Sequence, residues 1–114
     1  MTLTNAPILE SENLILRGPE KEDAEEVISF LLDENRSRGF GSSPDRSDAW
    51  RWFSTNVGHW HWHGYGYFMI ETKLGEVAGM SGIWNPEGWP EPEVGWAVFD
   101  KFEGKSIAFE AACR

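Results

Sequence analysis

Two segments of the chain place apolar residues at the spacing of an amphipathic helix. In the first, they recur at i, i+3, i+4 and i+7 behind several acidic residues that suit the positive end of a helix dipole: Ala24, Val27, Ile28 and Leu31. In the second, one helical face carries Ala49, Phe53, Val57 and Trp60. Ser47 is the predicted N-cap of this second helix, and Gly64 is expected to end it.

Four other segments have the composition of β-strands. Residues 14–17 are a short apolar run, residues 65–72 are rich in aromatic side chains, and residues 77–84 follow across a tight turn as the partner of a hairpin. An alternating run predicts a fourth strand over 93–99, after a loop with three prolines. The 114 residues therefore form one domain (1–114) in the order β-α-α-β-β-β-α, with mostly antiparallel pairing.

Beyond the fourth strand, a short Gly-containing loop leads into a segment of helix formers. A strand that opens through such a loop into a helix points several backbone N–H groups in one direction, at the positive end of the helix dipole. This geometry holds an anion, most often a phosphate. We therefore predict a phosphate-binding loop at residues 103–108. The alternative is a plain strand–turn–helix junction without a ligand.

Three landmarks follow one another along the chain: residues 8–17, which end in Leu-Ile-Leu-Arg, residues 93–96, and the loop 103–108. Together they resemble the GNAT superfamily of N-acetyltransferases. The first landmark resembles the first strand of its ribosomal-protein-acetyltransferase-like branch. Residues 93–96 read Glu-Val-Gly-Trp and resemble the Glu-x-Gly-Tyr/Trp that opens the fourth strand of that branch. Residues 103–108 are similar to the acetyl-CoA signature Arg/Gln-x-x-Gly-x-Gly/Ala, from which Glu103 and Ser106 depart.

The resemblance implies an α+β, GNAT-like fold whose mostly antiparallel mixed sheet is flanked by helices, with the C-terminal part of the fold missing from this sequence. It also implies an acyltransferase that uses acetyl-CoA to acetylate a primary amine, either a protein N-terminus or a small molecule. The general acid of the family would lie beyond residue 114. A fourth strand without its usual neighbour would leave an open edge, so we expect a homodimer.

The resemblance assigns two groups of residues to acetyl-CoA. The loop would grip the pyrophosphate through its backbone, because Gly104 lets the backbone approach closely and Lys105 offers a cationic contact. The assigned loop residues are Glu103, Gly104, Lys105, Ser106 and Ala108. The fourth strand would pair with the amides of the pantetheine arm through the backbone of Ala97, Val98 and Phe99. The alternative for these three is ordinary pairing with a neighbouring strand.

Glu93 is the candidate general base, because members of the family often use an acidic residue at the start of this strand. A carboxylate works near neutral pH only if burial raises its pKa or a chain of water molecules relays the proton. The alternative is a solvent-facing glutamate beside Glu87 and Glu91. The candidate substrate-binding residues are Tyr65, Trp84 and Trp89.

Composition narrows the choice of partners. Nineteen acidic residues against ten basic ones give a formal net charge of −9, which disfavours nucleic acid. This charge suits a cationic or amine-bearing partner, and a solvated acidic surface explains it equally well. The single cysteine, Cys113, excludes an internal disulfide and fits a reducing compartment. No apolar run approaches the roughly 18 residues of a membrane span, so we expect a cytoplasmic protein that binds no membrane.

Two other functions stay open from the sequence. The first is a non-catalytic, truncated GNAT-like module that serves as an interaction surface. The second is a small-ligand or metal binder built on the Trp/His-rich segment that contains His59, His61 and His63. Alternate residues of a strand lie about 6–7 Å apart, which is too wide to close a zinc site unaided, so we expect no metal.

Overall fold

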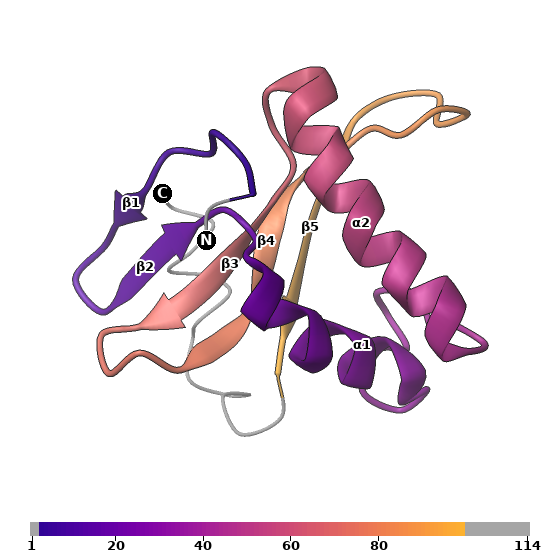
Figure 1. Ribbon diagram of the computed structural model, residues 1–114, viewed down its shortest axis with the longest axis horizontal. Coiled ribbons are helices and arrows are strands. Elements are labelled where there is room, and N and C mark those ends of the chain that lie inside the picture. Colours follow the sequence, from indigo (N-terminus) through magenta and orange to yellow (C-terminus); the bar gives the residue numbers. More distant parts are fainter. Residues whose placement is uncertain (1–2, 100–114) are drawn as a thin grey trace.

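The computed structural model describes residues 3–99 of the chain. Five antiparallel strands form one sheet, and they neighbour each other in sequence order (Figure 1). The strands are β1 (Leu9–Glu10), β2 (Leu14–Arg17), β3 (Tyr67–Thr72), β4 (Val77–Trp84) and β5 (Glu93–Val98). Within the described residues, β1 and β5 are therefore the two edges of the sheet.

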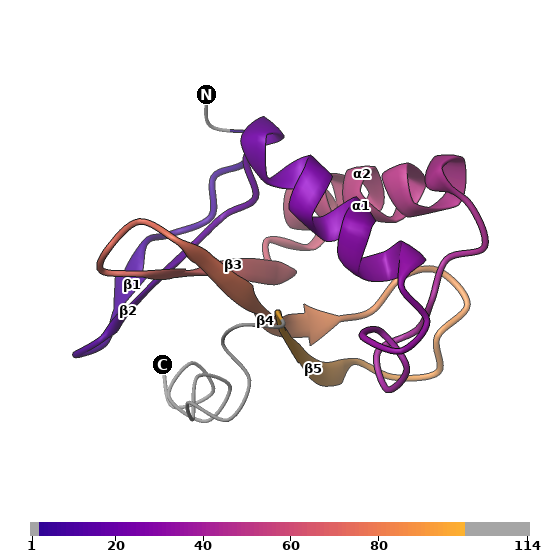
Figure 2. The same cartoon turned by 90° about the horizontal axis from the view of Figure 1, so that it is seen from below.

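Both helices pack on one face of the sheet (Figure 2). A short 3-10 helix, η1 (Lys21–Asp23), leads directly into α1 (Ala24–Leu32), and α2 (Arg46–His63) follows after the loop 33–45. The predicted α+β order is confirmed over residues 3–99, whereas the predicted third helix lies outside them. No helix in this part of the chain is long and apolar enough to cross a membrane.

The boundaries of α2 show where local pattern succeeds and fails. Gly64 ends the helix as predicted, because its φ of 81° lies in the left-handed region that glycine tolerates. The predicted N-cap is wrong. The side chain of Asp45, and not of Ser47, accepts a hydrogen bond from the backbone N–H of Asp48 at 2.8 Å. The pattern also misses β1, since a strand of two residues carries no periodic signal.

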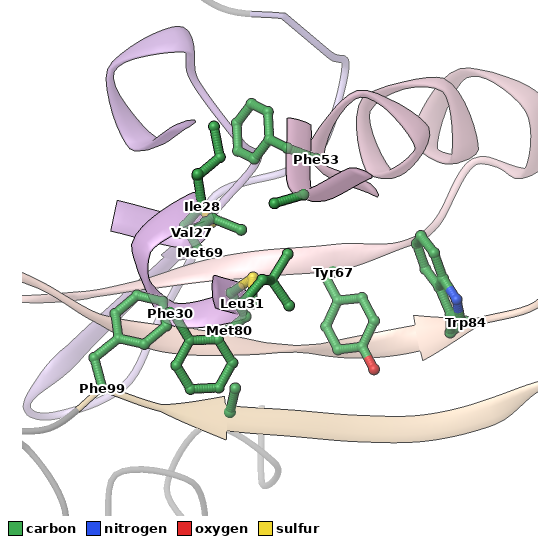
Figure 3. Close-up of a cluster of buried hydrophobic side chains, with 12 residues drawn as sticks. Val27, Ile28, Phe30, Leu31, Phe53, Tyr67, Met69, Met80, Trp84 and Phe99 are labelled. Carbon is green, nitrogen blue, oxygen red and sulfur yellow. The ribbon is translucent and has the colours of Figure 1, made fainter. Parts of the chain in front are cut away.

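Apolar side chains pack on both faces of the sheet. The larger cluster lies between the helices and the sheet and includes the residues labelled in Figure 3: Val27, Ile28, Phe30, Leu31, Phe53, Tyr67, Met69, Met80, Trp84 and Phe99. The smaller cluster holds Leu14, Leu16, Ile70 and Ala78. Met69 and Ile70 are neighbours in β3 yet belong to different clusters, because successive strand side chains point to opposite faces.

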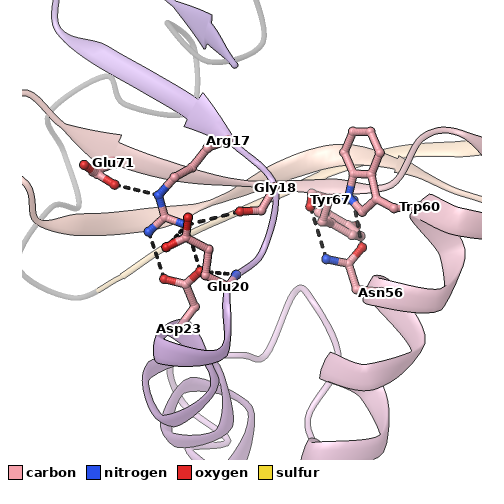
Figure 4. A network of polar contacts seen from close by, with 8 residues as sticks. All are labelled: Arg17, Gly18, Glu20, Asp23, Asn56, Trp60, Tyr67 and Glu71. Atoms are coloured by element: carbon pink, nitrogen blue, oxygen red, sulfur yellow. Dashed lines mark hydrogen bonds and ion pairs between the residues drawn. The ribbon is translucent and has the colours of Figure 1, made fainter. Parts of the chain in front are cut away.

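Arg17, the last residue of β2, joins three elements at one end of the helix-covered face (Figure 4). Its guanidinium donates two hydrogen bonds to Asp23, at 2.8 and 2.9 Å, and one to Glu71 of β3 at 2.6 Å. Asp23 also accepts a hydrogen bond from the backbone N–H of Glu20. This network holds the start of α1 against β2 and β3, and the Asp23 side chain within it is only 3% exposed.

Candidate active site

Glu93 is the first residue of β5 and lies opposite Trp84 of β4 in the strand register. Cross-strand partners point to the same face, so Glu93 shares the helix-covered face with Trp84. The Glu93 side chain is exposed, and within residues 3–99 no ion pair or hydrogen bond reaches it. The described residues do not bury this carboxylate. A role as general base therefore stays a prediction, and it would rely on proton relay through water.

Tyr67 lies between the helices and the sheet, close enough to Glu93 for the charge of that carboxylate to affect the pKa of the tyrosine. Its side chain is buried, and the hydroxyl points toward β5 (Figure 3), where a Cβ placed on Gly95 would be 2.2 Å from the hydroxyl oxygen. Burial, with a smaller contribution from the charge of Glu93, raises the pKa of Tyr67 to about 12. The phenol stays protonated at neutral pH, so it has a hydrogen to donate.

The backbone of Tyr67 is held by α2 (Figure 4). The side-chain amide of Asn56 accepts a hydrogen bond from the Tyr67 N–H at 2.9 Å and donates one to the Tyr67 carbonyl at 3.1 Å. The indole N–H of Trp60 donates to the same carbonyl at 3.0 Å. Asn56 is fully buried, so these bonds satisfy an amide that would otherwise be costly to bury.

A wall of aromatic rings surrounds Tyr67. Its ring centroid lies 5.4 Å from that of Phe40 in the loop 33–45, 5.6 Å from Trp52 of α2 and 5.3 Å from Trp84 of β4. Trp52 and Trp84 stack on each other at 5.2 Å. Trp84 is 7% exposed, so it supports this wall and has little surface left for contact with a substrate.

His59 ties α2 to two loops. Its Nδ1 donates to the carbonyl of Tyr65 at 2.7 Å, and its Nε2 accepts from the backbone N–H of Asn85 at 2.9 Å. These partners require the neutral ring with hydrogen on Nδ1. The ring stacks on Trp84 at 4.7 Å, and burial, opposed by the bond to Tyr65 and aided by His63, lowers the pKa of His59. The contacts of His59 therefore serve the structure, because they hold α2 against the segments that contain Tyr65 and Asn85.

A cavity of about 530 Å³ lies between the second half of α2 and the loop 85–92. We call it the α2–loop pocket; the residues that shape it here are Thr55, His59, Trp62, His63, Glu87 and Trp89. Of the three candidate substrate-binding residues, Trp89 lines this pocket, whereas Tyr65 stacks behind it on His63 at 5.1 Å. Within residues 3–99, no group of three His, Cys, Asp or Glu side chains is placed to hold a metal ion.

The strand β5 offers backbone groups at its outer edge. Phe99 donates its N–H to Ala78 of β4 at 2.8 Å, and Val98 is paired in register with Gly79. In an antiparallel ladder, backbone groups of alternate residues point to opposite sides, so Ala97 and Phe99 turn theirs toward β4 and Val98 turns its own outward. Of the three residues assigned to the pantetheine arm, only Val98 presents an N–H and a carbonyl at the edge, and the neighbour that shares this orientation is Trp96.

A second hollow, of about 510 Å³, lies beside this strand. It is formed by the loop 33–45, through Arg36 and Phe40, and by Trp96, Ala97 and Val98 of β5. Within residues 3–99 the outer backbone groups of β5 have no strand partner, and they border a space between the strand and this loop. The other residues assigned to acetyl-CoA lie outside the described part of the chain: Glu103, Gly104, Lys105, Ser106 and Ala108.

The interior of this site does not follow from the sequence. Tyr67 reads as one more aromatic of a strand, and Asn56 as a polar residue on a helix. The one available signal was Gly95 in the Glu-Val-Gly-Trp segment, because a glycine inside a strand marks a close approach by another group. In the structure that group is the Tyr67 hydroxyl.

Several solved acetyltransferases have this architecture. An acetyltransferase from Agrobacterium tumefaciens is 34% identical, with a TM-score of 0.86 over 93% of this chain and 62% of that chain. An enzyme from Salmonella typhimurium that modifies the N-terminal serine of the 50S ribosomal subunit protein L7/L12 is 14% identical, with a TM-score of 0.71 over 94% and 64%. The microcin C7 self-immunity acetyltransferase, in complex with acetyl-CoA and AMP, is 19% identical, with a TM-score of 0.66 over 96% and 64%.

The matches cover most of this chain but a smaller share of each solved acetyltransferase. This chain spans somewhat less than two thirds of the Agrobacterium tumefaciens protein, although nearly all of its own residues are matched. The comparison with curated proteins gave no match. The acetyltransferase (GNAT) domain model matches residues 13–114, and the antiparallel sheet with both helices on one face is the fold that the sequence landmarks imply. The chain therefore belongs to the GNAT acetyltransferase family.

Proposed function

We propose that the protein transfers an acetyl group from acetyl-CoA to a primary amine. The observation that carries this proposal is the match of residues 13–114 to the acetyltransferase (GNAT) domain. Two local features support it. Within residues 3–99, the outer edge of β5 is open and borders a hollow that a pantetheine arm could follow. In the same part of the chain, the Glu93 side chain at the start of this strand has no ion-pair or hydrogen-bond partner. In this proposal the loop 103–108 holds the pyrophosphate.

Acetyl transfer requires the protein to position the thioester and the amine and to provide one proton acceptor. A neutral amine attacks the thioester carbonyl, a tetrahedral oxyanion forms, and the thiolate of CoA leaves as the amide appears. The amine must lose a proton, and Glu93 accepts it through water, because its side chain is exposed at the rim of the site. The Tyr67 hydroxyl is protonated and buried close enough to Glu93 that the two groups interact electrostatically.

The class of acceptor is a finer proposal. The Salmonella typhimurium enzyme with the same fold acts on a protein N-terminus, and the negative charge of this chain suits a cationic acceptor. We take a protein N-terminus or a small amine as the acceptor. A cytoplasmic location and a homodimer stay predictions, the latter resting on the open edge of β5 within the described residues.

Binding of CoA tests the proposal directly. At one hundred times its dissociation constant, CoA should stabilise the protein by about 2.7 kcal/mol in thermal denaturation. Gly104→Val should abolish this shift, because a β-branched side chain blocks the approach of the backbone to the pyrophosphate. Gly58→Val is the matched control, since a Cβ placed at this helical position meets no heavy atom within 4 Å outside its own helix backbone. No shift with CoA, or equal shifts in both variants, would overturn the assignment.

A further inference from the structure

The α2–loop pocket has walls of a kind that bind flat rings. One wall comes from α2 and carries Trp62 and His63, and the other comes from the loop 85–92 and carries Trp89. Trp62 is 85% exposed and Trp89 is 41% exposed. Two large, exposed indoles that border one cavity leave apolar surface in water, which a ligand bound in the cavity would cover.

The volume and rigidity of the pocket suit a small molecule. About 530 Å³ is within the range of pockets that bind small ligands. The back of the pocket is fixed, because His59 is hydrogen-bonded to Tyr65 and Asn85 and stacks on Trp84. A fixed back wall means that ring binding does not first have to order the protein.

The charge of the pocket is as informative as its shape. Glu87 is the one formally charged residue that lines it within the described part of the chain, and no Lys or Arg does so. His63 stacks on Tyr65 and makes no hydrogen bond to another described residue, so its ring nitrogens can meet a ligand. A cation beside Glu87 and over an indole face gains from both the charge and the ring.

The pocket adjoins the proposed reaction site. The loop 85–92 that forms one wall begins directly after Trp84 and ends directly before Glu93, and these two residues are cross-strand partners. Directly paired residues in an antiparallel sheet lie about 4.5–5.5 Å apart. A ring held at Trp62 and Trp89 therefore lies at the end of the sheet where Glu93 stands.

We infer that the α2–loop pocket binds the planar ring of a small, cationic, amine-bearing molecule between Trp62 and Trp89, with Glu87 beside its positive charge. This inference rests on the proposed function only where it makes that molecule the acetyl acceptor; ring binding itself does not need CoA. It selects ring-bearing small amines over extended protein N-termini as substrates.

Calorimetry of the protein without CoA tests the pocket, with tryptamine as the probe. Tryptamine should bind at least about tenfold more tightly than n-butylamine, which has the amine without the ring, and than indole-3-propionate, which has the ring with the opposite charge. Trp62→Ala and Trp89→Ala should each weaken tryptamine binding by about tenfold or more. Trp50→Ala is the matched control, because Trp50 is an exposed indole of α2 that does not line the pocket.

Glu87→Gln should weaken tryptamine binding by about three- to tenfold and leave the weak binding of indole-3-propionate unchanged or improved. Equal binding of the three probes, or an equal loss in the Trp50→Ala control, would overturn the inference. With acetyl-CoA present, Trp62→Ala should raise the KM for tryptamine and leave the KM for acetyl-CoA unchanged. Absence of CoA binding would instead overturn the proposed function, while tryptamine binding in a Trp62-dependent manner would still support the ring site.

Discussion

The charged residues at the two ends of the helix-covered face differ in burial and in pairing. At one end, Arg17 is hydrogen-bonded to Asp23 and Glu71, and these groups are largely buried. At the other end, Glu87 and Glu93 are exposed and, within residues 3–99, no ion pair reaches them. Paired and buried charges tie elements together, whereas exposed carboxylates beside a cavity and an open strand edge remain free to meet a ligand.

The same contrast applies to aromatic and imidazole rings. Trp84 and His59 are buried in mutual stacking, and their polar atoms serve the fold. Trp62 and Trp89 lie a few residues away in sequence and are exposed at a pocket. Residue type alone therefore does not separate structural from ligand-facing groups in this chain; the partner of each side chain does.

The largest effect is expected at the paired end. Arg17→Met should lower the free energy of unfolding by about 3–5 kcal/mol, because it leaves the buried carboxylate of Asp23 without its partner. Lys73→Met is the control, since the pair of Lys73 with Glu10 is exposed to solvent and should contribute little to stability. Urea denaturation measures both. Similar small losses in the two variants would contradict the contrast between the ends.

At the open end, the main effect should be on rate. Glu93→Gln should lower kcat by about 10²-fold, as expected for loss of a general base, and leave the affinity for CoA and the thermal stability nearly unchanged. Release of free CoA thiol from acetyl-CoA measures turnover. Glu91→Gln offers a control from the same exposed acidic loop. Undiminished turnover in Glu93→Gln would make Glu93 a solvated strand-start residue.

A double-mutant cycle can show how tightly Tyr67 is held beneath Glu93. Gly95→Ala should cost about 2 kcal/mol of stability, because its Cβ would lie 2.2 Å from the Tyr67 hydroxyl oxygen in a packed aromatic wall. In a Tyr67→Phe background that oxygen is absent and the cost should fall by at least half. Additive losses, measured by thermal denaturation, would mean that Gly95 is needed for another reason.

The smallest effect concerns pH. The pKa of His59 is lowered below its ordinary value of 6.5 in the folded protein, so the unfolded chain binds the proton more readily. The stability that this neutral ring contributes is complete above pH 6.5 and is lost as the pH falls through the lower folded pKa. His59→Phe should cost about 1 kcal/mol at neutral pH and should lose stability less steeply between pH 6.5 and 5 than the parent protein. Denaturation at each pH measures the free energy of unfolding of both proteins. If the two proteins lost stability equally as the pH falls, His59 would not be the source of this pH dependence.

Much of the fold was predictable because its signals are local. The apolar spacing of α1, the left-handed glycine that ends α2 and the hairpin of β3 and β4 each depend on residues within a few positions of one another. The family landmark at 93–96 also located the start of β5 correctly. The N-cap at Asp45 was misplaced by two residues, because Asp and Ser are both good caps and only the actual turn decides between them.

The sequence by itself determined the order of the elements, the α+β class and the membership of the GNAT family that the domain match confirms. Only the tertiary structure decided which polar and aromatic side chains stabilise the fold through contacts within the protein and which stay exposed. His59 meets Asn85 across 26 positions of the chain, and Tyr67 meets Asn56 across 11. Such partners are brought together by packing of the helices on the sheet, which no local periodicity encodes, and this packing leaves Trp62, Trp89 and Glu87 exposed together at one pocket.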